Sequence, residues 1–199
     1  MRVAVASRNP GKLAELRRLL DDHPWELVGL DAAGFTGELE EPADTYAENA
    51  AAKALAVCAA TGMASLADDS GIEVPGLGGW PGAASARWMG PEAGDPDRLH
   101  GLLVEVERRC PGDRRARYVC VVTLARPGTA PLSARGETTG VLVPPRGTGG
   151  FGYDPGFLSD DLGITFGEAT AAAKDGVSHR ARALAALLAL LAKPGEDQA

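Results

Sequence analysis

Cysteine and histidine are scarce in this chain of 199 residues. The three cysteines, Cys58, Cys110 and Cys120, are odd in number and far apart, which argues against a disulfide framework and against a zinc motif. We expect them to pack in the interior. Three histidines are too few for a multi-histidine metal site, and no G-x-S-x-G motif is present to pair one of them with a nucleophilic serine.

Long apolar runs and an excess of positive charge are also missing. No run is long enough to span a membrane, and residues 1–6 enter a strand-like segment without the features of a signal peptide, so we expect a cytoplasmic protein with no membrane partner. A formal net charge of −7 disfavours broad binding to nucleic acid, which requires many neutralised phosphates. A single anionic ligand needs only a local cluster of cations.

The composition is that of a loop-rich α/β protein, with 45% hydrophobic residues, 26 glycines and 14 prolines. We predict one domain over residues 1–193 and a polar C-terminal tail over 194–199. Predicted strands and helices alternate early in the chain. In the middle, apolar and polar residues alternate as they do in the strands of a β-hairpin. A mixed sheet flanked by helices is therefore expected. The predicted strands cover residues 2–6, 25–30, 63–67, 115–124 and 133–143, and the predicted helices begin near residues 10, 45, 95 and 178. The second of these helices starts with a capping box at Thr45 and should end near Gly62.

Two adjacent carboxylates, Asp68 and Asp69, follow the apolar run over residues 63–67. We expect that strand to end there, with Ser70 and Gly71 making the bend. Adjacent anions at a strand end favour a divalent cation with oxygen ligands, and such a cation often serves a phosphorylated substrate. A purely structural turn is the alternative, because these are all common turn residues.

The segment SRNPGK, residues 7–12, joins the first predicted strand to a helix. Asn9 is the predicted N-cap and Pro10 the first helical residue. Free N–H groups, the helix dipole and Lys12 can converge on a phosphate there. The Walker pattern is rejected because Leu13 stands where a serine or threonine is needed. A plain helix cap is the alternative.

An acidic segment, residues 40–44, precedes a helix that carries Asn49 and Lys53 on one face. If the fold brings Glu41 near Asp69, the two carboxylates can bind Mg²⁺ with Lys53 as their charge partner. Otherwise the segment is a solvated acidic surface.

Two further segments carry candidate binding residues. In residues 147–155, glycines surround Phe151 and Tyr153, an arrangement that suits stacking on a flat heterocycle but also fits a hairpin loop with two anchoring rings. Near the last predicted helix, Lys174 and the run 178–180 gather cations at a helix N-terminus. Such a place binds an anion or a carbonyl oxygen, although an ordinary N-cap with solvated cations is the alternative.

In order and wording these segments resemble the inosine triphosphate pyrophosphatase family. The resemblance runs from residue 4 to about residue 191 and depends on several motifs in series. They are SRNPGK, EEPADTYAENAAAKA, LADDSGIEV with GLGGWPGAASARW, GTGGFGYDPGF and KDGVSHRARAL. The family commonly has glycine where this chain has Arg8, which either strengthens a phosphate contact or points to solvent.

The resemblance implies a bilobed α/β fold with a long mixed β-sheet, flanking helices and a substrate cleft between the lobes. It also implies a homodimer and a Mg²⁺-dependent reaction that converts ITP, dITP or XTP to the nucleoside monophosphate and pyrophosphate. Asp69 would orient or deprotonate the attacking water, with Lys53 beside it, and Ser70 would touch the substrate. Glu41, Asp69 and Asp68 would bind Mg²⁺.

For the remaining site residues the resemblance implies contacts with the nucleotide. The triphosphate would be held by Ser7, Arg8, Asn9, Pro10, Gly11 and Lys12. The purine would be stacked, bordered or read at its edge by Phe151, Gly152, Tyr153, Asp154, Lys174, His179 and Arg180.

Two other functions stay open on the sequence. A non-catalytic nucleotide sensor could use the same stacking loop and cationic helix ends, but it would not need Glu41, Asp68 and Asp69 together. A pyrophosphatase for other modified nucleotides would share the phosphate-binding residues and differ at the base pocket. The preferred purine, the sugar, the dimer contacts and the basis on which GTP is excluded are not identified by the sequence.

Overall fold

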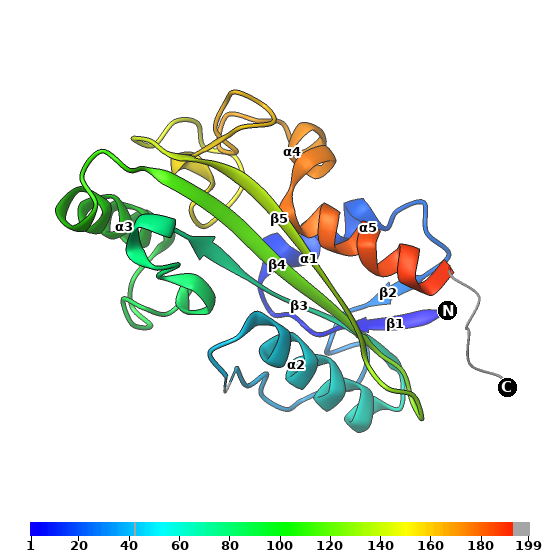
Figure 1. Ribbon diagram of the computed structural model, residues 1–199. Coiled ribbons are helices and arrows are strands. Elements are labelled where there is room, and N and C mark those ends of the chain that lie inside the picture. The colour runs from blue at the N-terminus through cyan, green and yellow to red at the C-terminus, as the bar shows by residue number, and fades with distance from the viewer. Residues whose placement is uncertain (42, 193–199) are drawn as a thin grey trace, which may run out of the picture.

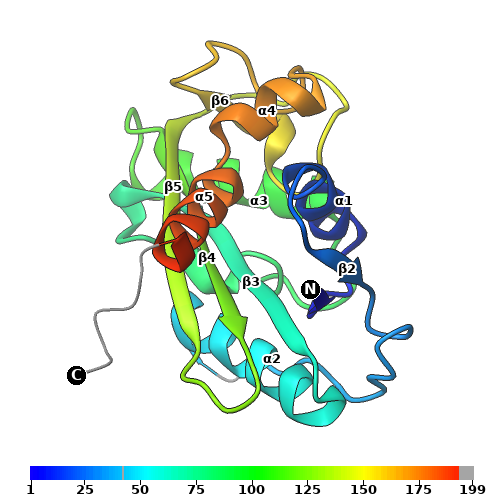
Figure 2. The same cartoon turned by 90° about the vertical axis from the view of Figure 1, so that its right-hand side faces the viewer.

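The computed structural model describes residues 1–41 and 43–192, in which a six-stranded sheet carries five α-helices (Figures 1 and 2). The predicted tail over 194–199 lies outside these residues. Among the residues described, no helix is long and apolar enough to cross a membrane. The elements are β1 (Arg2–Val5), α1 (Pro10–Leu19), β2 (Glu26–Val28), α2 (Tyr46–Thr61), β3 (Ala64–Glu73), η1 (Pro75–Leu77), η2 (Gly82–Ala84), α3 (Asp95–Arg109), β4 (Arg115–Ala125), β5 (Leu132–Leu142), η3 (Asp154–Gly156), β6 (Phe157–Ser159), α4 (Ala171–Val177) and α5 (His179–Ala192).

The sheet is mixed, as predicted, with the strand order β2-β1-β3-β4-β5-β6. Strand β1 pairs in parallel with β2 and β3, whereas β3, β4, β5 and β6 pair antiparallel to one another. The predicted pairing of the strands near 115–124 and 133–143 is confirmed, because β4 and β5 form one long hairpin. The α/β fold class is therefore the expected one.

Helices cover both faces of the sheet at the β1 end (Figure 1). On one face, Val3 and Leu66 lie in a core cluster with Leu16 of α1 and Leu187 of α5. On the other face, Ala67 lies in a cluster with residues of α2. Successive residues of a strand point to opposite faces, so Leu66 and Ala67 show which helices each face of β3 meets.

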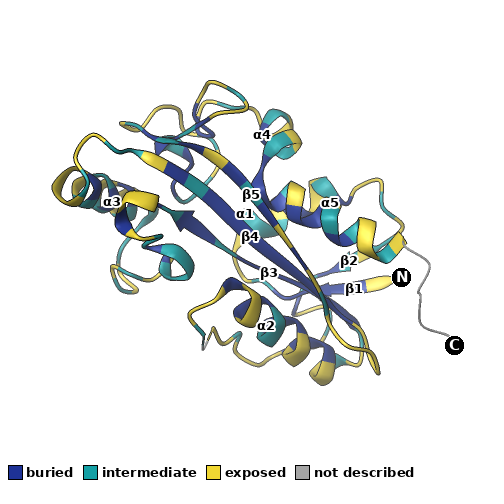
Figure 3. Ribbon diagram, in the orientation of Figure 1, coloured by how far each residue is buried: buried dark blue, intermediate teal, exposed yellow. Residues whose placement is uncertain are grey.

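A second core lies at the far end of the long strands (Figure 3). There Ile72 of β3 and Tyr118 of β4 join Leu102 of α3, Phe157 of β6 and the loop residue Phe166. One continuous sheet thus carries separate apolar clusters at its two ends, which gives the molecule its two lobes. Between these clusters, the middle of β3 carries the polar residues Asp68, Asp69 and Ser70.

The predicted bend at Ser70 and Gly71 is wrong, because β3 continues through both residues to Glu73. Ser70 pairs with Cys120 and Gly71 pairs with Val119 in the antiparallel ladder. Gly71 is needed for a close approach and not for a turn. A Cβ atom there would meet the carbonyl oxygen of Gly82 and would lie 2.5 Å from Ser85 Oγ.

Helix α2 begins and ends where the sequence predicted. Thr45 is the N-cap, and its Oγ1 accepts a hydrogen bond from Glu48 N at 3.3 Å. Gly62 ends the helix in the left-handed conformation with φ of 66°. These two ends place Asn49 and Lys53 on a buried face that points toward the middle of the sheet.

Candidate active site

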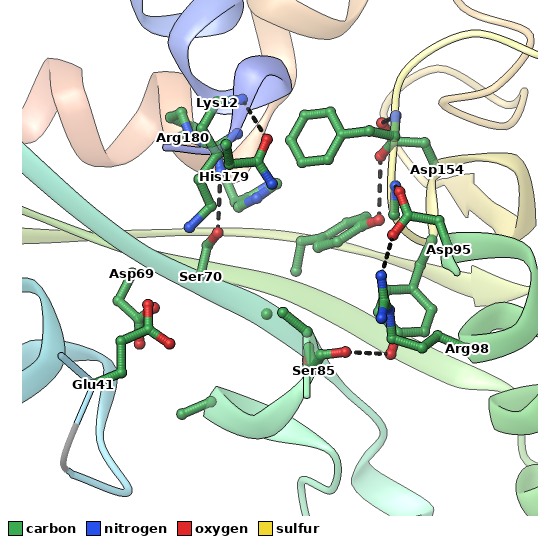
Figure 4. Close-up of a pocket in the computed structure, with 18 of the residues that line it drawn as sticks. Lys12, Glu41, Asp69, Ser70, Ser85, Asp95, Arg98, Asp154, His179 and Arg180 are labelled. Carbon is green, nitrogen blue, oxygen red and sulfur yellow. Dashed lines mark hydrogen bonds and ion pairs between the residues drawn. The ribbon is translucent and has the colours of Figure 1, made fainter. Parts of the chain in front are cut away.

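A pocket lies over the middle of the sheet, where segments from both ends of the chain meet (Figure 4). An adjoining cavity at the start of α1 shares part of its wall. The predicted residues that line the pocket are Asn9, Lys12, Glu41, Asp69, Ser70, Phe151, Gly152, Tyr153, Asp154, Lys174, His179 and Arg180. Ser7, Arg8 and Lys53 line the adjoining cavity, whereas Pro10, Gly11 and Asp68 line neither.

The start of α1 forms the cap that the sequence predicted. Asn9 Oδ1 accepts a hydrogen bond from Lys12 N at 3.1 Å, and Ser7 Oγ accepts one from Asn9 N at 3.2 Å. Pro10 occupies the first turn. The Lys12 side chain is largely buried, and its Nζ lies 3.2 Å from Asp68 Oδ2. The N-terminus of α1 therefore directs the positive end of its dipole toward the pocket. The charge of Lys12 beside it is already partly balanced by Asp68.

Two other residues of the segment 7–12, Gly11 and Arg8, have different structural roles. Gly11 lies against the ring of Phe151, and a Cβ atom at residue 11 would lie 2.5 Å from Phe151 Cδ1. Arg8 is exposed, and its Nη2 donates to the carbonyl oxygen of Gly37 at 2.9 Å. Here the arginine that departs from the family pattern holds a neighbouring loop.

Asp69 lies on the face of β3 that meets α2. Its Oδ2 accepts a hydrogen bond from Asn49 Nδ2 at 3.2 Å, and its Oδ1 accepts one from Lys53 Nζ at 3.3 Å. Lys53 also donates to Glu41 Oε1 at 2.6 Å, and Arg87 Nη1 donates to Glu41 Oε2 at 2.9 Å. The fold therefore brings Glu41 near Asp69, which was the condition set by the sequence (Figure 4). Lys53 forms ion pairs with both carboxylates.

Burial and the neighbouring carboxylate of Glu41 raise the pKa of Asp69, and Lys53 and Lys12 oppose that rise. Burial lowers the pKa of Lys53, but Asp69, Asp68 and Glu41 outweigh it and hold that pKa above its ordinary value. Lys53 is therefore protonated and positively charged between the carboxylates of Glu41 and Asp69.

The donor set at this place fits a magnesium ion. Magnesium is usually held by one or two carboxylates, and its other positions are filled by water and substrate phosphates. Glu41 and Asp69 are such a pair, and each has an oxygen that reaches Lys53. No group of three or more metal-ligating histidine, cysteine, aspartate or glutamate side chains occurs in residues 1–41 and 43–192. These residues therefore do not form a site in which protein side chains supply every ligand of the metal.

Asp68 points to the opposite face of β3, because successive side chains of a strand alternate. Its Oδ2 accepts hydrogen bonds from Arg180 Nε at 3.2 Å and from Arg180 Nη2 at 3.1 Å, and it also pairs with Lys12. Burial opposes its charge, but Lys12 and Arg180 hold the pKa of Asp68 well below its ordinary value. Asp68 is thus the counter-ion of two cations, on the face of β3 opposite to Asp69. Its role as a magnesium ligand stays a prediction.

Arg180 and Lys174 form a buried ion network with carboxylates from distant parts of the chain. Arg180 is 1% exposed, and its Nη1 donates to Glu15 Oε2 while its Nη2 donates to Ser70 Oγ at 3.0 Å. Lys174 Nζ lies 2.6 Å from Glu15 Oε1 and 2.5 Å from Asp154 Oδ2. Burial raises the pKa of Glu15, but Arg180 and Lys174 outweigh it and hold that pKa below its ordinary value.

Asp154 fixes the loop that carries Phe151. Its Oδ2 accepts a hydrogen bond from Phe151 N at 2.8 Å, and its Oδ1 accepts one from Tyr118 OH at 3.1 Å. Gly150 has φ of 70°, and a Cβ atom there would collide with the Asp154 carboxylate. Lys174 Nζ lies 4.9 Å from the centre of the Phe151 ring. The ring therefore stands at the pocket with a cation at one face and Gly11 beside it.

Comparison with known proteins identifies the family of this chain. The chain matches the Ham1 family from residue 3 to residue 190. It belongs to the Ham1 family. Two relatives named dITP/XTP pyrophosphatase, from Nocardia farcinica and Deinococcus radiodurans, are 48% and 50% identical to it. The alignments cover 96% and 94% of this chain and 95% and 92% of those proteins.

Solved structures of the family have the same fold. A HAM1 protein from Coxiella burnetii superposes with a TM-score of 0.87 at 35% identity, over 96% of this chain and 98% of that one. A nucleoside-triphosphatase, dITP/XTP pyrophosphatase, from Mycobacterium abscessus superposes with a TM-score of 0.75 at 39% identity, over 97% and 100% of the two chains. The fold of this Ham1 chain is thus shared with its relatives over nearly its whole length.

His179 of this Ham1 chain is a buried, neutral histidine. Its ring stacks on Tyr118 with the ring centres 4.5 Å apart, and its Nδ1 has no hydrogen-bond partner among the described residues. Burial, together with the charges of Arg180 and Lys174, holds the pKa of His179 well below its ordinary value. The imidazole therefore stays uncharged beside Lys174 and Arg180.

This burial predicts a pH dependence of folding. The unfolded chain protonates His179 near pH 6.5 and the folded chain does not, so the free energy of unfolding should fall as pH drops below about 6.5, by up to about 1.4 kcal/mol per pH unit. Urea unfolding of His179→Gln should lack that component. His100→Gln, which changes an exposed histidine, should keep it. Identical pH slopes for the native chain and His179→Gln would contradict the prediction.

Several residues of the site escaped the sequence analysis. Glu15 follows Lys12 by three residues, so the helical period could have found it on the same face of α1. Asn49 was placed on the correct face, but its bond to Asp69 was not foreseen. The others reach the pocket through contacts distant in sequence, and the sequence patterns assigned none of them a role in the site: they are Ser85, Arg87, Asp95, Arg98 and Tyr118. Ser85 and Arg87 do lie in the motif GLGGWPGAASARW.

Proposed function

We propose that this chain hydrolyses the non-canonical purine nucleoside triphosphates ITP, dITP and XTP to the nucleoside monophosphate and pyrophosphate. One observation carries the proposal. A single pocket is lined by the carboxylates Glu41 and Asp69, by the cations Lys12, Lys174 and Arg180, and by the ring of Phe151. A nucleoside triphosphate has a matching chemistry, with an anionic chain at one end and a flat heterocycle at the other.

The phosphate end supplies charge and orientation. Lys12 and the N–H groups that open α1 bind the triphosphate, and Lys53 keeps Glu41 and Asp69 facing one another. Glu41 and Asp69 would hold Mg²⁺, which when bound neutralises charge on the phosphates. In this proposal Asp68 acts as the counter-ion of Lys12 and Arg180, outside the magnesium site.

Asp69 orients the attacking water at its carboxylate and takes up its proton. The water oxygen forms a bond to the α-phosphorus, and the bond from that phosphorus to the oxygen bridging to the β-phosphorus breaks. The electron pair leaves with pyrophosphate. No covalent intermediate on the protein is required.

The base end selects the purine. Phe151 stacks on the ring system, Tyr153 borders it, and Arg180 or Lys174 donates to its 6-oxygen. Adenine carries an amino group at that position, which would set a donor against a buried donor. His179 and Asp154 complete this wall, where burial raises the pKa of Asp154 against the influence of Lys174.

The proposal also covers the organisation of the chain. Residues 1–193 form one nucleotide-hydrolysing unit, and the chain acts as a homodimer in the cytoplasm, where free nucleotides occur. Support for a single unit comes from the pocket, because residues of α1, β3, the 151–154 loop and α5 all contribute to one wall.

The decisive experiment is product analysis with ITP, XTP, GTP and ATP in the presence of Mg²⁺. The proposal expects pyrophosphate and the monophosphate from ITP and XTP, and little product from ATP. Release of orthophosphate would identify a different bond as the one cleaved. Tight binding of ITP without any product would favour a nucleotide sensor.

Replacing Lys12 by alanine should lower kcat/KM for ITP by at least about tenfold, because the triphosphate loses a largely buried point charge. High salt should not restore the loss, since screening cannot replace a missing charge. Arg17→Ala removes the same charge from an exposed position of the same helix and serves as the control. Steady-state kinetics at low and high salt measure both. Equal losses of kcat/KM in the two variants would mean that the segment SRNPGK caps the helix and does not bind the triphosphate.

A further inference from the structure

The loop that carries Phe151 is tied across the pocket to the start of α3. Gly152 N donates to Asp95 Oδ2 at 2.7 Å, although the two residues are 57 positions apart. Asp95 and Arg98 also line the pocket. Figure 4 shows Asp95 between Asp154 and Arg98, on the side of the pocket away from Glu41 and Asp69.

The carboxylate of Asp95 is itself held in place. Arg98 Nη2 lies 2.7 Å from Asp95 Oδ1, and Arg98 Nη1 donates to the carbonyl oxygen of Ala93. The side chain of Arg98 is 15% exposed and that of Asp95 is 44% exposed, so the pair is shielded from solvent on the Arg98 side only. One oxygen of Asp95 thus faces its own helix, and the other is left to accept from Gly152 N.

The peptide next to Phe151 is therefore fixed from two directions. Asp154, from the same loop, accepts from Phe151 N, and Asp95, from α3, accepts from Gly152 N. Gly152 has φ of 64°, a conformation that favours glycine and turns its N–H toward α3. Two consecutive N–H groups bound by two carboxylates leave the Phe151 backbone little freedom.

The remaining contacts between the loop and this side of the pocket hold other residues. Tyr153 OH donates to the carbonyl oxygen of Ser85 at 2.7 Å and accepts from Trp88 Nε1 at 2.8 Å. Gly156 lies against Leu99 of α3. These contacts anchor the loop after Phe151, so loss of the Asp95 bond should free the ring without detaching the loop.

We propose that Asp95 is a positioning residue that sets the placement of the Phe151 ring over the purine, and that Arg98 keeps Asp95 in the accepting orientation. This inference deepens the proposed function and rests on it for the identity of the base. Asp95 acts through Gly152 and need not touch the nucleotide. Its loss should therefore weaken binding of the base and leave binding of phosphate unchanged.

The test compares two ligands on Asp95→Ala, Asp95→Asn and Asp97→Ala. IMP carries the base, whereas pyrophosphate carries none, and calorimetry measures both in the presence of Mg²⁺. The dissociation constant of IMP should rise about tenfold in Asp95→Ala, while that of pyrophosphate stays within twofold. Asp95→Asn keeps a carbonyl oxygen for Gly152 N but loses its charge toward Arg98, so it should recover part of the affinity.

Asp97→Ala is the matched control on the same helix. Asp97 is exposed, and its Oδ2 accepts from Gly94 N, so the variant disturbs the cap of α3 without touching the Phe151 loop. It should leave both dissociation constants unchanged. Amide hydrogen exchange gives a second measurement, in which Gly152 N–H should exchange faster in Asp95→Ala and not in Asp97→Ala.

Kinetics separate this inference from the proposed function. In Asp95→Ala, KM for ITP should rise about tenfold with kcat within twofold of the native value. Absence of pyrophosphate release by the native chain would overturn the proposed function, but the IMP and exchange measurements would still decide the role of Asp95. Unchanged IMP affinity in Asp95→Ala, or an equal loss in Asp97→Ala, would overturn the positioning role.

Discussion

Asp69→Asn should lower kcat for ITP hydrolysis by about a thousandfold or more, while the protein remains folded. The substitution keeps the shape of the side chain and a carbonyl oxygen that can accept from Asn49 or Lys53. It removes the negative charge that would bind Mg²⁺ and the base that would take the proton of water. Initial rates of pyrophosphate release measure the loss.

The fold of this variant should survive, although Asp69 is only 3% exposed. Burial raises the pKa of Asp69, which shows that its charge is disfavoured at this place, so a neutral amide relieves that cost. Urea unfolding should confirm a free energy of unfolding within about 1 kcal/mol of the native value. Asp160→Asn, at an exposed position outside the pocket, is the control for charge loss. A folded Asp69→Asn protein with near-native turnover would remove Asp69 from the mechanism.

Arg180→Ala should destabilise the protein by about 3–5 kcal/mol, which is the largest stability effect we expect from one substitution. The guanidinium is the shared partner of Glu15 and Asp68, and all three side chains are buried. Its removal would leave Asp68 with Lys12 and Glu15 with Lys174, each carboxylate short of a partner. Urea unfolding at neutral pH measures the change.

Arg182→Ala provides the matched control for this stability prediction. Arg182 lies two residues further along α5, and its pair with Asp161 is half-exposed, so its loss should cost less than about 1 kcal/mol. If Arg180→Ala lost no more stability than Arg182→Ala, the buried ion network would not be a major contribution to the free energy of unfolding. In folded Arg180→Ala, the ratio of kcat/KM for ITP to that for ATP reports base reading. An unchanged ratio would assign Arg180 to support of the fold alone.

Local sequence patterns predicted most of the elements of this fold. Asn9 and Pro10 mark the start of α1, Thr45 and Gly62 bound α2, and alternation over residues 115–143 gives the hairpin of β4 and β5. Each of these signals comes from residues close together in the chain, and the structure satisfies them with local hydrogen bonds.

The failure at Ser70 and Gly71 has a tertiary cause. Serine and glycine favour turns when nothing else decides, but here the β4 ladder pairs both residues. Gly71 is selected by the close approach of Gly82 and Ser85, which belong to a segment that follows it. No window of neighbouring residues contains that information.

The site was predictable as a set of residue types and not as a network. The sequence named Lys174 and Arg180 as cations at a helix start, but their partner Glu15 is 159 and 165 residues away. Burial decides the role of these cations, because a solvated arginine and a buried one have the same local sequence. The family resemblance placed the candidate residues in one pocket. The structure adds that Asp69 pairs with Lys53, whereas Asp68 pairs with Lys12 and Arg180.

The alternation of β3 makes the length of that strand chemically significant. Asp68 faces the cations of α1 and α5, and Asp69 faces Lys53 of α2. Deletion of one residue earlier in β3 would exchange the two sides: Asp69 would take the place of Asp68, and Asp68 would take the place of Ala67, among apolar residues of α2. The strand can therefore change by substitution, whereas a change in its length would disrupt both charge clusters at once.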